Sequence, residues 1–303
     1  MRTRSWRAGS AVIAGAAVVL AAALGLHALV PGWLGTALDS GLPWLGLLLV
    51  PLLALSALRR SRRAFAVALV PVVVWTTMFG RVLLPRSGAD HHDLRIATLN
   101  LGAANADAAA TVRAVAGEEP DVLVLQELTT ANRKVAEREL RGGWQHRIVA
   151  GTVGLWSRLP LTGTAAVDIG IGWTRALRAS VTTPDGPVRV YAVHLASARP
   201  GATAERDQTL AALAREVAAD GSERLVVAGD LNTTTTDRRF RELAPLRDTQ
   251  QEAGAGFGFT WPAELPVMRP DHILQRGMST QRSWVVRVPG SDHRAALAEI
   301  DTA

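Results

Sequence analysis

Long apolar runs dominate the first 84 residues of the chain. Three such runs, rich in Ala, Val and Leu, cover residues 11–30, 42–58 and 64–84, and only the third contains a charge, Arg81. A helix needs about 20 consecutive apolar residues to cross a hydrocarbon core of about 30 Å. The pattern therefore predicts three transmembrane helices in a membrane domain of residues 1–86, followed by a polar linker at residues 87–93.

The rest of the chain alternates between short apolar runs and amphipathic stretches, as expected of an α/β domain. Helical spacing of apolar residues occurs at 107–116, 130–140 and 203–219. Runs of strand length and composition occupy residues 94–101, 122–126, 145–149, 154–157, 164–169, 175–183, 188–194, 224–228, 271–274, 283–288 and 294–300. Consecutive strands between helices predict two sheets packed face to face and flanked by helices, with residues 294–300 closing a sheet.

The distribution of arginine predicts the orientation of the membrane domain. Arginines cluster before the first apolar run and between the second and third, at Arg2, Arg4, Arg7, Arg59, Arg60, Arg62 and Arg63. The loop at residues 31–41 carries only Asp39. Because arginine-rich loops stay in the cytoplasm, everything after Arg86 is predicted to be extracytoplasmic. If the first run is a cleaved signal peptide instead, two spans remain and the prediction for this domain is the same.

Composition narrows the possible chemistry. The chain has no cysteine, which excludes disulfides, thiolate metal sites and a cysteine nucleophile. Its formal net charge is +6, but the residues before Ala64 carry the whole excess, so residues 64–303 are formally neutral. A neutral domain lacks the broad basic surface of a nonspecific nucleic-acid-binding protein. This weakens a nuclease interpretation without excluding it.

Polar side chains with catalytic potential stand at the ends of the predicted strands. They are Asn100, Glu127, His194, Asp230, Asn232, Asp271, Asp292 and His293. Singly, each has a structural interpretation, such as a helix cap, a buried histidine or an Asx-turn. Together, carboxylates and an amide suit a hard cation such as Mg²⁺, and a carboxylate beside an imidazole suits a general base or a group that stabilises phosphate charge. Asp230 and Asn232, two residues apart, are expected on one side of an extended segment.

Six short motifs resemble the endonuclease/exonuclease/phosphatase superfamily in order and spacing. They are TLN at 98–100, QE at 126–127, VHL at 193–195, GDLN at 229–232, RPDHIL at 269–274 and SDH at 291–293. The resemblance runs from Leu94 to the end of the chain, so the expected catalytic domain is residues 94–303. It implies a four-layer α/β/β/α sandwich with two mostly antiparallel sheets, and a metal-dependent phosphoric ester hydrolase.

The resemblance also implies a role for each side chain. Asn100, Glu127 and Asp292 would hold Mg²⁺, or Mn²⁺ or Ca²⁺, with Glu127 as the principal ligand. Asp230 would align or activate the attacking water, and Asn232 would bind the phosphate. His194 would bind the phosphate or assist the leaving group. His293, oriented by Asp271, would act as a base or as a stabiliser of charge.

Three spans that carry an external domain of this kind resemble the actinobacterial membrane proteins of the VanJ type, which are linked to teicoplanin resistance. We therefore expect a multi-pass protein of the cell membrane that hydrolyses an extracytoplasmic phosphate ester, with a lipid-linked ester as the leading candidate. Anchoring raises the effective concentration of membrane substrates more than that of diffusible DNA. Two alternatives stay open: an anchored extracellular nuclease, and a noncatalytic binding protein that kept the fold. No oligomeric state follows from the sequence.

Overall fold

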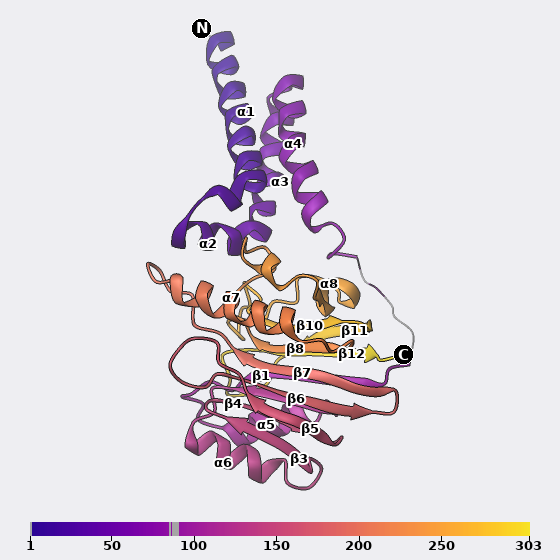
Figure 1. The fold of residues 1–303 in the computed structure, drawn as a ribbon. Coiled ribbons are helices and arrows are strands. Elements are labelled where there is room, and N and C mark those ends of the chain that lie inside the picture. Colours follow the sequence, from indigo (N-terminus) through magenta and orange to yellow (C-terminus); the bar gives the residue numbers. More distant parts are fainter. Residues whose placement is uncertain (1, 85, 87–90) are drawn as a thin grey trace. The chain divides into compact units, whose positions relative to one another are not determined.

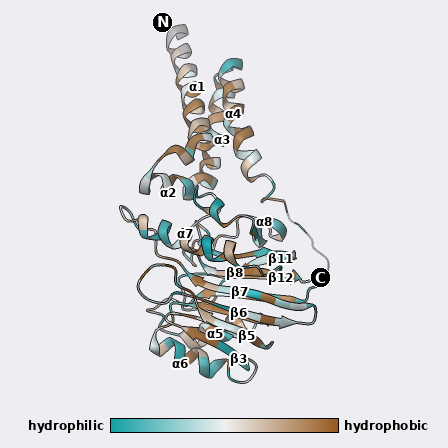
Figure 2. Ribbon diagram, in the orientation of Figure 1, coloured by the Kyte–Doolittle hydropathy of each residue, from teal (hydrophilic) through white to brown (hydrophobic). Residues whose placement is uncertain are grey.

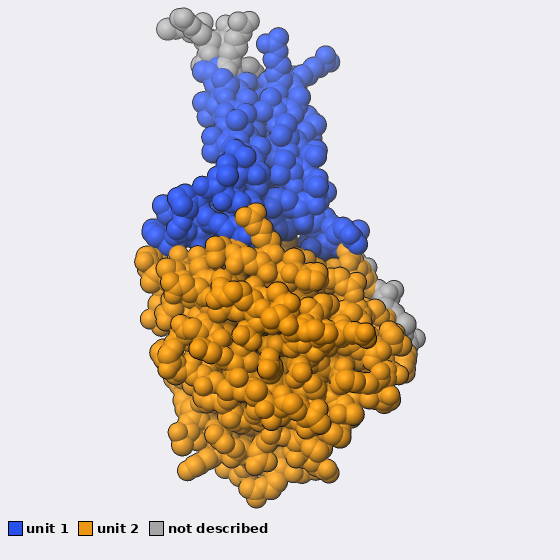
Figure 3. All heavy atoms as spheres, in the orientation of Figure 1, with its two compact units in different colours: residues 1–84, 236–238 blue, residues 85–235, 239–303 orange. Residues whose placement is uncertain are grey.

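The computed structural model describes residues 2–84, 86 and 91–303. It divides into two compact units, residues 1–84 with 236–238 and residues 85–235 with 239–303, which Figure 3 colours separately. Residues 87–90 of the predicted linker lie outside the described residues. In the described remainder of the linker, His91 Nε2 lies 2.9 Å from Asp93 Oδ1.

The first unit is built from apolar helices. Its elements are α1 (Arg2–Leu26), η1 (His27–Leu29), α2 (Gly32–Gly41), η2 (Leu42–Leu48), α3 (Leu49–Leu58) and α4 (Arg62–Phe79). α1, α3 and α4 pack together (Figure 1), and hydrophobic residues cover most of their length (Figure 2). Three stretches, Ala8–Leu29, Gly32–Leu58 and Arg62–Phe79, are long and apolar enough to cross a membrane.

The number of apolar helices agrees with the prediction, whereas their limits differ. The second stretch begins at Gly32 rather than at residue 42, because α2 and η2 continue into α3. Pro43 has no N–H to donate, and a 3₁₀ segment carries the chain past it. The third helix ends at Phe79 rather than at residue 84, immediately before Gly80, a residue with low helix propensity.

Two six-stranded sheets form the second unit. The first sheet has the order β11-β12-β1-β2-β4-β3 and comprises β1 (Leu94–Asn100), β2 (Val122–Gln126), β3 (His146–Ala150), β4 (Val153–Ser157), β11 (Ser279–Val286) and β12 (Ala295–Asp301). The second has the order β5-β6-β7-β8-β10-β9 and comprises β5 (Leu161–Ala166), β6 (Ala176–Thr183), β7 (Gly186–His194), β8 (Leu225–Asp230), β9 (Arg247–Asp248) and β10 (Asp271–Arg276). Among the described strands, only the pairs β1–β2 and β7–β8 are parallel, so both sheets are mixed and mostly antiparallel.

Helices cover the outer faces of the two sheets, which makes the predicted four-layer α/β/β/α sandwich. α5 (Ala108–Ala116) and α6 (Thr130–Glu139) bury apolar side chains against the first sheet. α7 (Ala204–Ala219) does the same against the second sheet. Two shorter elements, η3 (Phe240–Leu243) and α8 (Thr249–Ala253), complete the unit.

Side chains alternate between the faces of each strand, and this alternation defines the core. Leu94 and Ile96 of β1 belong to the layer between the sheets, whereas Ala97 and Leu99 pack beneath the helices. The other central strands repeat this pattern, so the layer between the sheets consists of Val, Leu, Ile and Ala together with Met278. Three short elements, η3, β9 and α8, were not predicted. Strand limits also differ: β5 begins at Leu161 and β11 at Ser279, whereas the predicted strands begin at residues 164 and 283.

The last strand occupies a different place from the predicted one. Residues 294–300 are predicted to close a sheet, but β12 lies inside the first sheet, between β11 and β1. It is antiparallel to both neighbours, and its residues Ala295 to Ile300 are buried. The half-exposed β11 forms the edge instead. Strand order depends on contacts distant in sequence, which apolar periodicity does not encode.

Candidate active site

The layer between the sheets becomes polar at one end, where four site residues lie. In the second sheet, His194 ends β7, Asp230 ends β8 and Asp271 begins β10, and the three are neighbours in the strand register. In the first sheet, Asn100 ends β1. Each residue continues the alternate positions that face the opposite sheet, so these side chains meet in the space between the sheets.

Asn100 links the two sheets through hydrogen bonds. Its Nδ2 donates to Asp230 Oδ2 at 3.0 Å and to Glu127 Oε1 at 3.2 Å. Its Oδ1 accepts a bond from the backbone N of Gly102 at 3.0 Å. Asn100 and Asp230 are buried, with 1% and 2% exposure. The amide therefore fixes the position of a buried carboxylate, which would otherwise be costly to desolvate.

Glu127 is directed into the site by an unusual backbone conformation. It follows β2 with φ = 57°, in the left-handed region that non-glycine residues rarely adopt. Its Oε2 accepts a 2.7 Å bond from the backbone N of Ala103, and its Oε1 lies 4.0 Å from His194 Nε2. The side chain is 31% exposed, although every residue of β2 is buried. Solvent therefore reaches this carboxylate.

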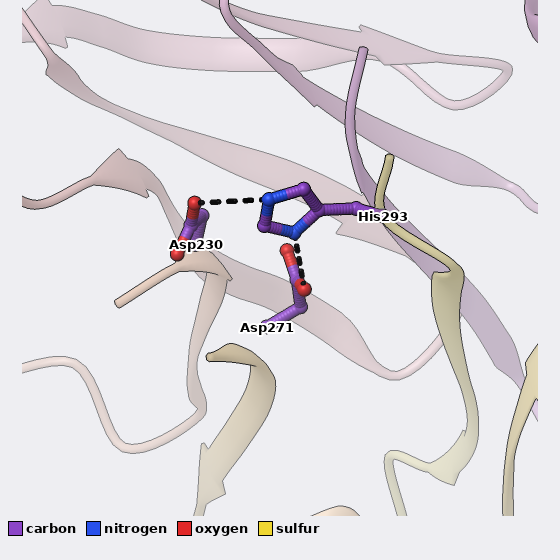
Figure 4. A group of neighbouring side chains, drawn as sticks. All are labelled: Asp230, Asp271 and His293. Atoms are coloured by element: carbon purple, nitrogen blue, oxygen red, sulfur yellow. Dashed lines mark hydrogen bonds and ion pairs between the residues drawn. The ribbon is translucent and has the colours of Figure 1, made fainter. Parts of the chain in front are cut away.

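Asp271 holds His293 in a fixed orientation (Figure 4). Asp271 Oδ2 lies 2.8 Å from His293 Nδ1 and also accepts a 2.6 Å bond from Thr260 Oγ1. The other ring nitrogen, Nε2, lies 4.0 Å from Asp230 Oδ2. Ser291 Oγ accepts from His293 N at 2.9 Å and donates to the carbonyl of Asn100 at 2.6 Å. The loop before β12 is thus tied to the end of β1.

The two histidines of the site have opposite pKa shifts. Burial lowers the pKa of His194 to about 4, because the neighbouring Asp230 opposes this effect only in part. Burial also lowers the pKa of His293, but the charge and hydrogen bond of Asp271, with the charges of Asp230 and Asp292, outweigh it and raise that pKa to about 10. At neutral pH, His194 is therefore neutral and His293 is an imidazolium. A cationic His293 can stabilise negative charge or donate a proton.

Arg175, which the sequence did not single out, also belongs to the site. It directly precedes β6, and its carbonyl accepts a 2.8 Å bond from His194 N. Burial lowers the pKa of its guanidinium, while the charges of Asp230 and Glu127 oppose that shift. The side chain is therefore half-buried beside two carboxylates. The one available signal was an arginine at the start of the apolar run at 175–183, and β6, which covers most of this run, pairs with β7, the strand that ends at His194.

Several buried polar atoms around the site have no hydrogen-bond partner among the described residues. They are His194 Nδ1, Asp271 Oδ1, Gln126 Oε1 and Arg175 Nε. Buried polar atoms are nearly always hydrogen-bonded, so a cluster of exceptions is typical of a place that binds water or a polar ligand. The cluster combines a donor, Arg175 Nε, with two acceptors, Asp271 Oδ1 and Gln126 Oε1, so it can bind both an anion and a water.

A divalent cation fits the outer side of the site better than its centre. Asp230, Asp271 and His293 have ligand atoms within 4.8 Å of one another, but an imidazolium bonded to Asp271 has no lone pair to offer. Asp292 is exposed and lies beside Gly102, where an added Cβ would be 3.4 Å from its Oδ1. Trp261 Nε1 lies 3.3 Å from Asp292 Oδ2.

The donor atoms at this outer side are suited to a hard cation. Asn100, Glu127 and Asp292 offer only oxygen ligands, which Mg²⁺, Mn²⁺ and Ca²⁺ prefer. Four carboxylates lie in or beside the site, against the cationic side chains of Arg175 and His293. A divalent cation would offset the remaining negative charge. The residues present therefore fit the predicted metal.

The backbone prediction for Asn232 is wrong. The chain is not extended after Asp230, because Asn232 has φ = 47° and its N donates to Asp230 Oδ1 at 2.9 Å, as in an Asx-turn. Asn232 Nδ2 donates to the carbonyl of Leu195 at 3.0 Å. The structure thus brings Asn232 beside the site but uses its amide to join the ends of β7 and β8. Its role toward phosphate stays a prediction.

Comparison with known proteins gives both a family and a fold. The model of the Endonuclease/Exonuclease/phosphatase family matches residues 97–293. D. rerio TDP2, crystallised with a single-strand DNA product, aligns with a TM-score of 0.59 and 19% identity over 69% of this chain and 99% of that one. A Bacteroides thetaiotaomicron mannosyl-6-phosphatase aligns with a TM-score of 0.59 and 14% identity over 68% and 99%.

A further solved structure with this fold is beta toxin from Staphylococcus aureus. It aligns with a TM-score of 0.54 and 14% identity over 68% of this chain and 99% of that one. At such identities the likeness shows a shared fold alone. A comparison with curated proteins finds no match.

Proposed function

Because this chain belongs to the endonuclease/exonuclease/phosphatase family, whose members hydrolyse phosphate esters, we propose that it is a membrane-anchored, divalent-metal-dependent phosphohydrolase. The proposed substrate is an extracytoplasmic phosphate ester, and the leading candidate is a lipid-linked one. The external location rests on the arginine distribution along the first 63 residues. The resemblance to VanJ-type membrane proteins extends the proposal to teicoplanin resistance.

The main support for the proposal is that carboxylates, an amide and two histidines of different charge lie close together at one end of the sandwich. Both oxygens of Asp230 accept hydrogen bonds, from Asn232 N and from Asn100 Nδ2, so this carboxylate is held in place. A fixed, buried carboxylate can orient water for attack on phosphorus and accept its proton. Asp230 is therefore the proposed base.

Cationic and neutral donors in the site would stabilise the charge that develops on the phosphoryl oxygens. His293, held by Asp271, and Arg175 are the cations, and neutral His194 can donate one further hydrogen bond. Asn100, Glu127 and Asp292 would hold the divalent ion, which when bound polarises a phosphoryl oxygen. These side chains act on the phosphate and not on the alcohol portion, so they do not distinguish among phosphate esters.

Two exposed apolar side chains favour a substrate with an apolar portion. Among the described residues of the second unit, the large hydrophobic side chains that are exposed are Trp173, at 60%, and Leu265, at 75%. Trp173 lies two residues before Arg175, in the loop before β6. Leu265 lies two residues after Ala263, whose N donates to the carbonyl of Asp292 at 2.7 Å. Trp173 therefore stands on a loop that supplies a site residue, and Leu265 stands on a loop bonded to one, where both can contact a lipid chain.

A hydrolysis panel on the detergent-purified full chain tests the proposal, with released phosphate measured for monoesters and cleavage products measured for phosphodiesters and DNA. The substrates are polyprenyl phosphates, phospholipids, nucleotides and DNA, each with Mg²⁺ and with a chelator. We expect metal-dependent release that is fastest with a lipid-linked phosphate. Rapid metal-dependent cleavage of DNA, with no turnover of lipid phosphates, would establish the nuclease alternative. Turnover of none of these substrates would favour a binding protein.

A nuclease is the second candidate, because D. rerio TDP2 has the same fold and was crystallised with a single-strand DNA product. The formal neutrality of residues 64–303 is the observation against it. The salt dependence of binding separates the two. A nuclease that contacts several phosphates would lose affinity steeply between 50 and 200 mM salt, by roughly 10³-fold for six contacts.

A further inference from the structure

A groove of about 490 Å³ lies in the first unit, at the turn that joins α3 to α4. This volume falls within the roughly 300–1,000 Å³ typical of small-ligand pockets. Its walls combine apolar side chains with two arginines and include Ala57, Arg60, Arg62, Phe65, Ala66 and Leu69. The turn lies at the end of two helical stretches that are long and apolar enough to cross a membrane. If these stretches span the membrane as the proposed function requires, the groove lies at a membrane–water boundary.

The arginines of the groove bring positive charge that the first 84 residues do not neutralise. These residues contain a single acidic residue, Asp39, which is buried with its Oδ1 2.6 Å from His27 Nδ1. The residues that line the groove include no acid. Arg60 and Arg62 are both exposed, and the first turn of α4 is the hydrophilic end of that helix (Figure 2). The groove therefore presents two cationic side chains to an anion.

Arg60 occupies a backbone position that glycine would fill with less strain. Its φ is 48°, and its N donates to the carbonyl of Ala57 at 2.8 Å, which ends α3 in a left-handed turn. Glycine is the usual residue in such a turn because it has no Cβ. An arginine here keeps a guanidinium at the groove at the expense of backbone strain, which is often retained at binding positions.

The apolar wall of the groove begins directly beside this charge. Phe65 and Leu69, four residues apart on α4, share one face of the helix and are 40% and 41% exposed. Ala57 and Ala66 keep the space between α3 and α4 open. A phospholipid has the same arrangement, a charged phosphate joined to an apolar chain. A free phosphate would leave the apolar wall without a partner.

We propose that this groove binds one anionic phospholipid, with its phosphate at Arg60 and Arg62 and one acyl chain along Phe65 and Leu69. Basic pockets between transmembrane helices are established binding places for anionic head groups. The bound lipid would join α3 to α4 across their turn and so stabilise the hairpin in the membrane. This site is independent of the catalytic residues and of the proposed phosphohydrolase activity.

Native mass spectrometry of the full chain in mild detergent tests the proposal. The protein is titrated with phosphatidylglycerol or with phosphatidylcholine of the same acyl chains. We expect one phosphatidylglycerol to bind roughly 30-fold more tightly, which corresponds to about 1 kcal/mol for each arginine. The double substitution Arg60→Gly and Arg62→Gln should abolish this preference. The control Arg81→Gln should keep it, because Arg81 is exposed and lies two residues beyond the other end of α4.

Two further variants distinguish a loss of lipid binding from a failure to fold. Arg60→Gly alone suits the left-handed turn, so it should fold well and still lose about half of the preference in free-energy terms. Ala66→Trp fills the groove and should weaken the binding of both lipids. Equal binding of the two lipids, or equal losses in the Arg81→Gln variant, would overturn the proposal. A dimer that excludes lipid and is disrupted by Ala66→Trp would assign the groove to a second copy of the chain.

Discussion

At the scale of single residues, the site depends on how burial and neighbouring charge set the protonation of its side chains. His194 and His293 both end up close to Asp230, yet only His293 also has the carboxylate of Asp271 at its second nitrogen. This additional anion keeps His293 cationic, whereas desolvation keeps His194 neutral. One histidine can therefore offset charge while the other serves as a neutral donor.

Glu127→Gln tests the proposed metal ligand. The substitution keeps the size of the side chain but removes the negative charge, so we expect a loss of roughly 100-fold or more in kcat/KM and weaker Mg²⁺ binding. Glu223→Gln is the matched control. Glu223 is exposed and lies just before the start of β8, whereas Asp230 lies at the end of that strand. Calorimetric titration with Mg²⁺ gives the second readout. Unchanged metal affinity in Glu127→Gln would remove Glu127 from the metal site.

The raised pKa of His293 predicts how activity falls at alkaline pH. The imidazolium should persist below about pH 10 and be lost above it, so kcat should fall on that limb. Asp271→Asn removes the anion that favours the charged form, and the limb should move down by about one to two pH units. A kcat–pH profile of both proteins measures this. An alkaline limb at the same pH in both would show that His293 does not produce it.

The same shift has a consequence for stability. The pKa of His293 is higher in the folded than in the unfolded state, so its protonation stabilises the fold fully at pH values below about 6.5. This contribution disappears as the pH rises through about 10.

At the scale of elements, a buried ion network supports the loop that follows β8. Asp248, which ends β9, makes two hydrogen bonds to Arg269, of 2.9 and 3.0 Å, and a third contact of 2.9 Å with His272 Nδ1. His272 Nε2 lies 2.8 Å from the carbonyl of Thr233. His272 faces away from Asp271, its neighbour in β10, so the strand carries a catalytic candidate on one face and a structural network on the other.

Asp248→Asn should destabilise the second unit by about 3 kcal/mol, because it leaves Arg269 buried without a full charge partner. Asp168→Asn is the control, since that carboxylate is exposed and an amide oxygen can still accept the 2.8 Å bond from Gly170 N. Urea denaturation in detergent measures the difference. Equal stability of the two variants would contradict the proposed support.

Strong acid should reduce the stability that Asp248 gives to the second unit. Burial alone would raise its pKa, but Arg269 and His272 outweigh burial and hold the pKa well below the ordinary value of 3.8. The stabilisation is therefore complete above about pH 4 and is lost only as the pH falls through the depressed pKa. The difference between wild type and Asp248→Asn should be constant from pH 5 to 7 and shrink in stronger acid.

The loop before β6 should set substrate preference. Trp173→Ser removes the exposed indole without changing Arg175, so activity on a lipid-linked phosphate should fall about 10-fold through a higher KM, while a water-soluble phosphate ester should be unaffected. The control is Leu58→Ser, which removes an exposed apolar side chain of the first unit. Trp284 is unsuitable as a control because its ring packs against Arg282. Equal losses on both esters would show that Trp173 supports the site rather than the substrate.

At the scale of the whole molecule, the orientation across the membrane decides which substrates the site can meet. The absence of cysteine makes this directly measurable. Gly142→Cys lies on an exposed turn with open space around its Cβ, and Arg63→Cys lies on the arginine-rich turn. A membrane-impermeant maleimide should label the first in intact cells and the second only after lysis. The reverse pattern would place the catalytic unit in the cytoplasm and remove an extracytoplasmic substrate.

The sequence alone determined the features that depend on local composition. Three apolar runs were sufficient to predict three apolar helices, because length and hydropathy are properties of consecutive residues. The alternation in β1, β2, β7 and β8 likewise predicted the strands, and the six motifs indicated the family and the four-layer sandwich. The strand-end positions of Asn100, His194 and Asp230 were also apparent, since each follows an apolar run.

Tertiary structure decided what depends on register and long-range contacts. The row formed by His194, Asp230 and Asp271 arises because β8 pairs with β7 in parallel and with β10 antiparallel, and no local pattern sets that alignment. The proximity of Arg175, the Asx-turn at Asn232 and the opposite charge states of two histidines also required the folded chain. Proximity sets pKa values and backbone hydrogen bonds, and residues far apart in the sequence become close only when the sheets pack.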